Sequence, residues 1–277
     1  LHNGHLQATG IDSTDKKQYF YHAQWEELRK FSKFSNMINF ANALPSFRRK
    51  ISYMINHPDE FSHKERVLSA MFRILEQTGM RVGSIEAVKR NNTYGLTTLK
   101  KRHVVEDKDG VHFEFKGKGA VDLEYILNDK NVADIIHYCE TISGQHFFDY
   151  LDDKGERHEI HAAHINAYIK ENMGESFSAK DFRTWRFSTF FLEEALKLDH
   201  KEKKPTLTAV LNKVAEQSGN TPAILKSSYV HPGLIEAVKI GDLEMLRDEE
   251  ENLAGLRKSE NLLYNYITSG HAKNVLK

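Results

Sequence analysis

The sequence predicts a mainly α-helical protein of the α+β class that carries one β-hairpin and opens with a short strand. Apolar residues recur at helical spacing over 63–77, and two runs with a period of two flank a Gly-Lys-Gly turn over 111–125. Residues 18–21 form the short strand before the first helical pattern. We therefore expect a helical main domain in which the hairpin is the prominent β element.

Helical periodicity is clearest over residues 63–77. One face of this segment collects apolar side chains, namely Val67, Leu68, Met71, Phe72 and Leu75. Gly79 ends the pattern, Gly83 loosens the turn that follows, and Arg81 stands between the two glycines. The sequence thus predicts a buried helix followed by a glycine-rich turn that exposes an arginine.

Composition describes a globular chain without naming its partner. The 277 residues suffice for one substantial core with a small appendage, and we divide them into 1–22, a main domain over 23–242 and a C-terminal helical tail over 243–277. No apolar run reaches the length of a membrane span, and no secretory leader opens the sequence, so we expect a cytoplasmic protein. The single cysteine, Cys139, cannot form an internal disulfide.

Basic and acidic residues balance, 39 against 39, which gives no sign of nucleic-acid binding. Local patches exist, however. Basic residues gather at Lys100, Lys101 and Arg102 and again over 201–204, whereas acidic residues gather over 248–251. Such runs most often form a solvated face. Charge alone therefore does not decide the function.

Helix-start chemistry recurs in the second half of the main domain. Ser178 and Asp181 have the spacing of a capping box, which predicts a helix that carries Arg183. The charged stretch over 199–205 reads as a linker after this helix.

The next two helices lead to a tyrosine. Apolar spacing after residue 206 predicts a helix with Gly219 as its C-cap. Thr221 and Pro222 can begin another helix, since proline is tolerated in a first turn. That short helix brings Tyr229 to its end, just before a second proline disfavours further helix.

Three familiar kinds of site are weighed and set aside. His158, His161 and His164 could bind zinc, but no HExxH or CxxC accompanies them, so surface histidines are the better interpretation. Gly117-Lys118-Gly119 lacks the spacing of a phosphate-binding loop and precedes a strand, so nucleotide binding is not indicated. No GxSxG occurs and Cys139 lies in an ordinary helical stretch, so a hydrolase is not indicated either.

Four dispersed residues share a chemistry: Arg81, Lys118, Arg183 and Tyr229. Each alone is most simply explained by solvation or packing. Together, two guanidinium groups can hold the nonbridging oxygens of one phosphate and stabilise phosphoryl transfer without a metal. A phenol can be the nucleophile when nearby cations lower the cost of ionising it. The chemistry makes the set coherent, although the spacing does not prove it.

Short motifs around these residues stand in an order found in a known family. They are GHLQA (4–8), KQYFYH (17–22), MRVG (80–83), LTTLK (96–100), FKGK (115–118), KDFRTW (180–185), GNTP (219–222) and SYVHP (228–232). In these stretches the chain resembles the small type IB DNA topoisomerases of poxviruses and bacteria, and looks closest to the bacterial branch. Any one motif is modestly specific, but the order makes the resemblance strong over nearly the whole chain.

The resemblance implies a helical catalytic domain of the kind shared by type IB topoisomerases and tyrosine recombinases, with a role for each residue. Tyr229 would attack the scissile phosphodiester and form a 3′-phosphotyrosyl link, expelling a 5′-hydroxyl. Lys118, aided by Arg81, would protonate the leaving oxygen, while Arg81 and Arg183 would grip the nonbridging oxygens. Asn220 stands where poxvirus enzymes carry a histidine. Its amide donates a hydrogen bond but carries no charge, so we expect it to contribute less than either arginine.

The implied activity is relaxation of supercoiled duplex DNA by single-strand cleavage and religation, without a cofactor, metal or ATP. Double-stranded DNA is the implied partner, and the expected contacts are Gln18, Tyr19, Tyr21, Lys100, Lys101 and Arg102. We expect a monomer with no membrane or nucleotide partner and a bacterial, nucleoid-associated location.

Residues 1–22 resemble only the end of the family's N-terminal β domain, which should cover the major groove. We therefore treat them as a remnant of that domain and expect weaker, more salt-sensitive duplex binding than a longer form would show.

Two rival hypotheses remain open. A tyrosine recombinase typically has a histidine three residues before the second arginine, where this chain has Lys180. It also tends to have a Leu-Gly-His motif where this chain reads Ser218-Gly219-Asn220. The other rival is a catalytically silent DNA-binding module that retains the fold. A covalent DNA adduct that depends on Tyr229 would exclude this second hypothesis.

Overall fold

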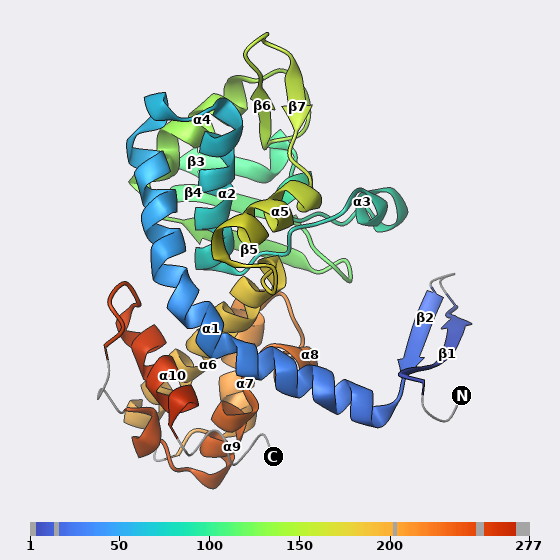
Figure 1. Cartoon of the computed structure of the whole chain (residues 1–277), viewed down its shortest axis with the longest axis vertical. Coiled ribbons are helices and arrows are strands. Elements are labelled where there is room, and N and C mark those ends of the chain that lie inside the picture. The colour runs from blue at the N-terminus through green and yellow to red at the C-terminus, as the bar shows by residue number, and fades with distance from the viewer. Residues whose placement is uncertain (1–3, 14–16, 202–203, 248–251, 270–277) are drawn as a thin grey trace.

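The protein is described by a computed structural model, in which residues 4–13, 17–201, 204–247 and 252–269 are described. Within them the fold is mainly helical with small antiparallel sheets, which confirms the predicted class. One long helix, α1 (Ala23–Asn56), joins a two-stranded arm to the body (Figure 1).

The helices of the body follow α1 in chain order. They are α2 (His63–Thr78), α3 (Ile85–Asn91), α4 (Ala133–Thr141), α5 (Ala162–Met173), α6 (Ala179–Lys201), α7 (Leu207–Ser218), α8 (Pro222–Ser228), α9 (Pro232–Ile240) and α10 (Lys258–Thr268). Short 3₁₀ helices occupy Pro58–Glu60, Leu96–Thr98, Lys101–His103, Lys130–Val132 and Glu244–Leu246. In Figure 1 the helices from α6 onward gather at one end of the body and the larger sheet lies toward the other.

The strands form three separate antiparallel sheets. The arm pairs β1 (Leu6–Ile11) with β2 (Lys17–Tyr21), and the body holds β3 (Val104–Asp107), β4 (Gly110–Lys116), β5 (Asp122–Leu127), β6 (Asp149–Leu151) and β7 (Arg157–Glu159). The predicted hairpin is confirmed as β4–β5, with Phe113 opposite Tyr125. Strand β3 extends it to three strands, and residues 152–156 form the turn between β6 and β7.

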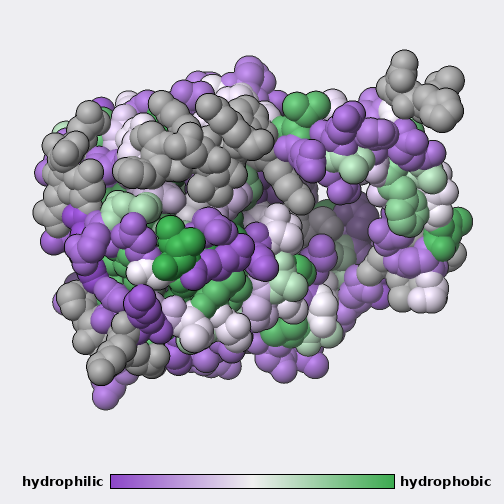
Figure 2. Space-filling view, turned by 90° about the horizontal axis from the view of Figure 1, so that it is seen from below, coloured by the Kyte–Doolittle hydropathy of each residue, from purple (hydrophilic) through white to green (hydrophobic). Residues whose placement is uncertain are grey.

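Helix α1 changes character along its length. Its first turns carry the arm and are exposed, whereas further along Phe40, Leu44 and Met54 are buried in the core. Seen from below, the surface is hollowed between the arm and the body (Figure 2). The C-terminal half of α1 is therefore anchored in the core by apolar burial, and its exposed N-terminal turns hold the arm away from the body.

The core joins α1, α2 and α6. The five apolar residues predicted on one face of α2 are all buried, and the ring of Phe40 lies edge-on to that of Phe182 at 5.0 Å between centroids. Helix α2 begins with a capping box between Ser62 and Glu65 and ends at Gly79, whose φ of +64° is left-handed. This end places the next segment, which carries Arg81, beside α6.

Helix α6 begins as predicted but ends later. The Ser178 hydroxyl donates to Asp181 Oδ2 at 2.8 Å, and the backbone N–H of Ser178 donates to the same oxygen. The linker predicted over 199–205 is wrong at its start, because α6 continues through Lys201. Charged residues are good helix formers when one face of the helix stays packed, so charge alone is a poor marker of a linker.

The C-terminal segment packs against α6. In α10, Leu263 and Tyr266 are buried in the same core as α6, while the acidic run over 248–251 lies outside the described residues. Arg48 Nη2 lies 2.6 Å from Glu260 Oε1, an oxygen that also accepts from Trp185 Nε1 at 3.1 Å. This buried pair joins α1, α6 and α10.

We expect Glu260→Ala to lower the free energy of unfolding by about 2–4 kcal/mol, because it removes one of the two carboxylates that pair with the buried Arg48 and the acceptor of Trp185 Nε1, and leaves Arg48 only the partial compensation of Glu76. Urea unfolding measures the change. The matched control is Glu216→Ala, whose ion pair with Lys213 is exposed and should contribute no more than about 1 kcal/mol. Equal losses in the two variants would contradict the structural role given to the buried pair.

The ion pair between Arg48 and Glu260 should also make the free energy of unfolding depend on pH. Burial opposes ionisation of Glu260, but Arg48 outweighs it and holds the pKa of Glu260 below its ordinary value. A lowered folded-state pKa means that this stabilisation is present above the pKa of an unfolded glutamate and is lost as the pH falls through the folded value.

No helix in the described part of the chain is long and apolar enough to cross a membrane.

Candidate active site

The turn after α2 fixes Arg81 through its backbone. The carbonyl of Arg81 accepts from the N–H of Leu96 at 2.8 Å, and that of Val82 accepts from Thr97. A Cβ on Gly95 would lie 2.5 Å from the Arg81 carbonyl oxygen, so only glycine permits this close approach. The motifs over 80–83 and 96–100 are therefore two segments held together by backbone hydrogen bonds.

Helix α6 places Arg183 in the interior, where it is only 4% exposed. Its Nη1 donates to the carbonyl of Gly79 at 2.7 Å, whereas Nε and Nη2 are buried without a hydrogen-bond partner among the described residues. Buried donors normally have partners, so these two unpartnered nitrogens mark a place where an anion can bind.

Tyr229 ends helix α8 and is held by its neighbours on both sides. Ser188 Oγ donates to the Tyr229 carbonyl at 3.0 Å and accepts from the N–H of His231 at 3.1 Å. The ring of Phe187 meets the tyrosine ring edge-on, at 5.4 Å between centroids, and the guanidinium carbon of Arg183 lies 4.9 Å from the tyrosine ring centroid. The phenol is thus presented by a rigid backbone beside a cation.

Asn220 contacts Arg81 across 139 positions of sequence. Its Oδ1 accepts from Arg81 Nη2 at 2.6 Å, and its Nδ2 donates to the Ser218 carbonyl at 3.0 Å. A buried amide that accepts from one side and donates to the other has a fixed orientation. The geometry gives Asn220 the task of orienting Arg81, a task that the sequence did not suggest.

A small pocket of about 280 Å³ joins these groups, lined by Arg81, Arg183, Lys180 and Tyr229 among others. Burial opposes ionisation of Tyr229, but the positive charge of Arg183, followed by those of Arg81 and Lys180, outweighs it and lowers the pKa of the phenol. Burial likewise lowers the pKa of Arg183. The site therefore holds more positive charge than its own side chains neutralise, which suits a phosphate and a phenolate nucleophile.

The structure does not bring Lys118 to the other four residues. It lies in the β4–β5 turn with an exposed side chain, and no hydrogen bond or ion pair joins it to another described residue. The turn end of the hairpin nevertheless lies close to the site. Leu123 of β5 packs on Gly219, where an added Cβ would lie 2.2 Å from its Cδ2. The hairpin thus packs on the loop that carries Asn220, and the exposed Lys118 side chain at its turn is accessible to a ligand.

The arm presents two of the predicted DNA contacts on one face. Tyr19 and Tyr21 stack at 6.5 Å between ring centroids, and the Arg29 guanidinium lies 5.5 Å from the ring centroid of Tyr21. Gln18 lies on the opposite face of β2 and donates to Asp12 Oδ2 at 2.6 Å. The tyrosine face is suited to DNA, whereas Gln18 points away from it.

The basic cluster over 100–102 divides into different environments. Lys100 Nζ donates to Gln145 Oε1 at 3.2 Å, and Arg102 is exposed with Nη2 on the Tyr94 hydroxyl. Lys101 Nζ donates to the carbonyls of Glu140 and Ile142 at the end of α4. These contacts occupy the ammonium of the half-buried Lys101, so the geometry gives no support to its predicted DNA contact.

Residues set aside in the sequence have ordinary surroundings. Burial raises the pKa of the Cys139 thiol to about 12, which makes it a poor nucleophile. His158 Nε2 lies 2.9 Å from Asp152 Oδ2, and these two with Glu156 form a group of possible metal ligands to which neither His161 nor His164 belongs.

Comparison with known proteins identifies the family. The family model described as "Eukaryotic DNA topoisomerase I, catalytic core" matches residues 22–253. DNA topoisomerase 1B of Acanthamoeba polyphaga mimivirus is 30% identical over 242 residues, which cover 82% of this chain and 70% of that protein. The chain belongs to the type IB DNA topoisomerases.

Other relatives agree with this assignment. DNA topoisomerase I of Monkeypox virus and DNA topoisomerase 1B of Vaccinia virus (strain Copenhagen) are each 26% identical over 243 residues, covering 83% of this type IB topoisomerase and 71% of each relative. The predicted family and enzyme class are thereby confirmed. These relatives are viral, so they give no support to the predicted bacterial branch.

A site-specific recombinase, XerH, solved bound to its difH substrate, is 15% identical with a TM-score of 0.39. The match covers 80% of this topoisomerase chain and 56% of the recombinase. A likeness of this size does not favour the recombinase hypothesis.

Three residues near the nucleophile escaped the sequence analysis as parts of the site. Lys180 lines the pocket, Ser188 holds the backbone on both sides of Tyr229, and Lys33 places its ammonium 5.4 Å from the Tyr229 ring centroid. Lys180 could have been predicted from the sequence, since it lies one helical turn before Arg183 and therefore on the same face of the helix. Nothing local in the sequence connects Lys33 with a residue almost 200 positions later.

Proposed function

We propose that this topoisomerase relaxes duplex DNA through a 3′-phosphotyrosyl intermediate at Tyr229. In the reaction the phenolate oxygen bonds to the scissile phosphorus and the bond from phosphorus to the 5′-oxygen breaks. The 5′-oxygen takes up a proton and leaves as a hydroxyl, and the broken strand then swivels about its intact partner. Religation reverses these steps, so the energy of the phosphodiester is retained and no nucleotide is consumed.

One observation supports this proposal above the others: two buried donors of Arg183, without partners among the described residues, lie beside a tyrosine whose pKa is lowered. The scissile phosphate would take hydrogen bonds from Arg183 and from Arg81, which Asn220 orients. Two guanidiniums in a partly buried pocket can stabilise the doubly charged transition state by themselves.

The finer points of organisation are proposed on the same footing. We assign residues 1–22 to the end of a DNA-covering β domain, 23–242 to the catalytic domain and 243–277 to a helical tail. Asn220, in place of a histidine, supports the bacterial branch and hence a location at the nucleoid. A single copy contains the proposed site, which is consistent with a monomer.

The proposal is tested by incubating the protein with supercoiled plasmid in EDTA without ATP. We expect a ladder of relaxed topoisomers, because the charge at the site comes from protein side chains. Positive and negative supercoils should both relax, since swivelling has no preferred direction. Relaxation that requires a divalent metal or ATP would contradict the proposed mechanism.

Lys118 as general acid makes a separate prediction. Lys118→Ala should slow cleavage about 10²- to 10⁴-fold on ordinary DNA, since an alkoxide leaves poorly without a proton. A substrate with sulfur in place of the 5′-bridging oxygen expels a thiolate, whose conjugate acid has a pKa of about 8.5, and should be cleaved at nearly the wild-type rate. Single-turnover cleavage measures both rates.

The controls separate acid catalysis from binding. Lys116→Ala removes an exposed cation from the same hairpin and should leave both substrates unaffected. Arg183→Gln should slow both, because its loss affects the nonbridging oxygens. If sulfur did not restore cleavage by Lys118→Ala, another group would be the acid.

A further inference from the structure

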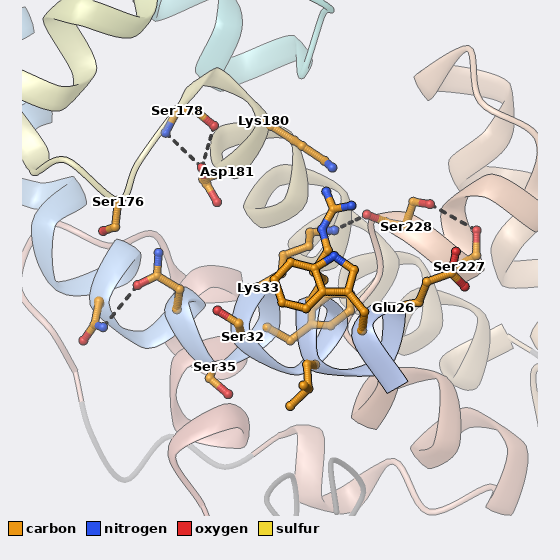
Figure 3. Close-up of a pocket in the computed structure, with 16 residues that line it drawn as sticks. Glu26, Ser32, Lys33, Ser35, Ser176, Ser178, Lys180, Asp181, Ser227 and Ser228 are labelled. Atoms are coloured by element: carbon orange, nitrogen blue, oxygen red, sulfur yellow. Dashed lines mark hydrogen bonds between the residues drawn. The ribbon is translucent and has the colours of Figure 1, made fainter. Parts of the chain in front are cut away.

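A lysine of helix α1 lies against the nucleophile in a way that the chemistry above does not use. Lys33 donates through Nζ to the carbonyl oxygen of Ser228, the residue immediately before Tyr229 (Figure 3). The same ammonium lies 5.4 Å from the Tyr229 ring centroid and 4.6 Å from that of Phe34. It therefore contacts the end of α8 and the nucleophile together.

The next residue of α1 supports the other side of the tyrosine. Phe34 is buried and its ring meets that of His231 edge-on, at 5.4 Å between centroids. Two consecutive residues of α1 thus hold the residue before Tyr229 and the residue two positions after it.

The position of Lys33 along α1 is equally informative. It lies where the helix passes from the exposed arm-bearing turns to the buried half. Between these turns and the catalytic body is a groove of about 1210 Å³, lined by Trp25, Arg29, Lys33, Lys180 and Ser228 among others. In Figure 3 Lys180 reaches toward the same space from α6. If DNA bound to the arm displaced the exposed turns of α1, Lys33 would move before the part of α1 that is buried in the core.

Placing a charged lysine at this partly buried position costs free energy, because burial opposes its protonation. Burial lowers the pKa of Lys33 to about 7, and the charge of Lys180 adds to the effect while Asp181 opposes it. Protonated or neutral, the nitrogen retains N–H groups that can donate to Ser228. A residue that served only to attract DNA would be expected in water, where its charge costs nothing.

We infer that Lys33 is a positioning residue for the nucleophile, which ties helix α1, and with it the β1–β2 arm, to the backbone that presents Tyr229. The inference rests on the proposed role of Tyr229. It assigns Lys33 no contact with the reacting atoms, so it differs from the roles of Arg81, Arg183 and Lys118. It also differs from a direct DNA contact, which would affect binding rather than the rate of the bound complex.

The experiment compares Lys33→Met, Lys33→Arg and Lys50→Met in the full chain. Lys50 is a matched control: it lies on the same helix, 5.4 Å from the ring centroid of Tyr168, and donates to Asn172 Oδ1 at 2.5 Å, away from the site. At saturating enzyme on a labelled duplex, we expect Lys33→Met to form the covalent adduct about 10- to 100-fold more slowly. Its Kd for DNA should change less than about twofold.

The other variants complete the comparison. Lys33→Arg keeps the donors and should recover most of the rate, while Lys50→Met should match the wild type. A Lys33→Met protein with a weakened Kd and an unchanged rate at saturation would make Lys33 a DNA ligand and overturn the inference. An unchanged rate and an unchanged Kd would overturn it as well.

A second readout does not depend on activity. Amide hydrogen exchange of the peptide over 225–231 should become about tenfold faster or more in Lys33→Met and stay unchanged in Lys50→Met. If the wild type forms no adduct, the proposed function fails, and the exchange result still decides whether Lys33 holds the tyrosine segment. Unaltered exchange in Lys33→Met would reject the inference by itself.

Discussion

Tyr229→Phe should abolish the covalent adduct and lower relaxation by on the order of 10⁴-fold or more, since the nucleophilic oxygen is gone. The substitution keeps the ring, which contacts Phe187 and Arg183, and it leaves the backbone bonds to Ser188 intact. Thermal stability and duplex binding should therefore remain close to wild type. Denaturing electrophoresis of labelled DNA after incubation measures the adduct.

The control is the same Tyr-to-Phe substitution at a tyrosine far from the candidate active site. Tyr53→Phe removes a hydroxyl that donates to Glu60 Oε2 near the end of α1. It should retain full activity. Adduct formation by Tyr229→Phe at even a tenth of the wild-type rate would show that another residue attacks the phosphate.

Arg183→Gln should reduce the cleavage rate by about 10²- to 10³-fold, because Nε and Nη2 supply charged donors where negative charge develops. The pKa of Tyr229 should rise once this charge is removed, so the ascending part of the pH–rate profile should move to higher pH. Single-turnover cleavage at a series of pH values measures both effects.

Helix α6 offers a matched control for Arg183. Arg186 Nε donates to the carbonyl of Gln77 at 2.9 Å, and its guanidinium carbon lies 5.1 Å from the Phe190 ring centroid. Arg183 has the same two kinds of contact, with Gly79 and with Phe187 at 5.2 Å. Arg186→Gln should therefore lose similar stability but keep its cleavage rate. Equal loss of rate in both would reduce Arg183 to a packing role.

Asn220→Ala tests the residue that orients Arg81. It removes one neutral hydrogen-bond acceptor from Arg81, so we expect a loss of about tenfold, well below that of Arg183→Gln. An equal loss in the two variants would show that Asn220 contacts the phosphate as strongly as an arginine.

Local patterns in the sequence were sufficient for much of the fold. The face of α2, the capping residues of α6 and the C-cap at Gly219 each depend on neighbours within a few positions, and all three were predicted. Strands β6 and β7 were missed because three residues are too few to show alternation. The end of α6 was missed because the charged residues from 199 onward were interpreted as a linker, although the helix continues through Lys201.

The site itself was predictable as a set but not as a geometry. The motifs named Arg81, Arg183 and Tyr229, yet nothing local indicated that Asn220 would orient Arg81 or that Lys33 would reach Ser228. Such pairs depend on how distant elements pack. For the same reason, a run of basic residues could not reveal that Lys101 is occupied by the carbonyls of α4.

The most direct test of the central claim is to trap the adduct on a labelled duplex, digest the protein and identify the linked peptide by mass spectrometry. The proposed mechanism predicts one DNA-linked peptide, modified at Tyr229 through the 3′-phosphate, with a free 5′-hydroxyl on the released strand. Linkage to a different residue, or through a 5′-phosphate, would contradict it.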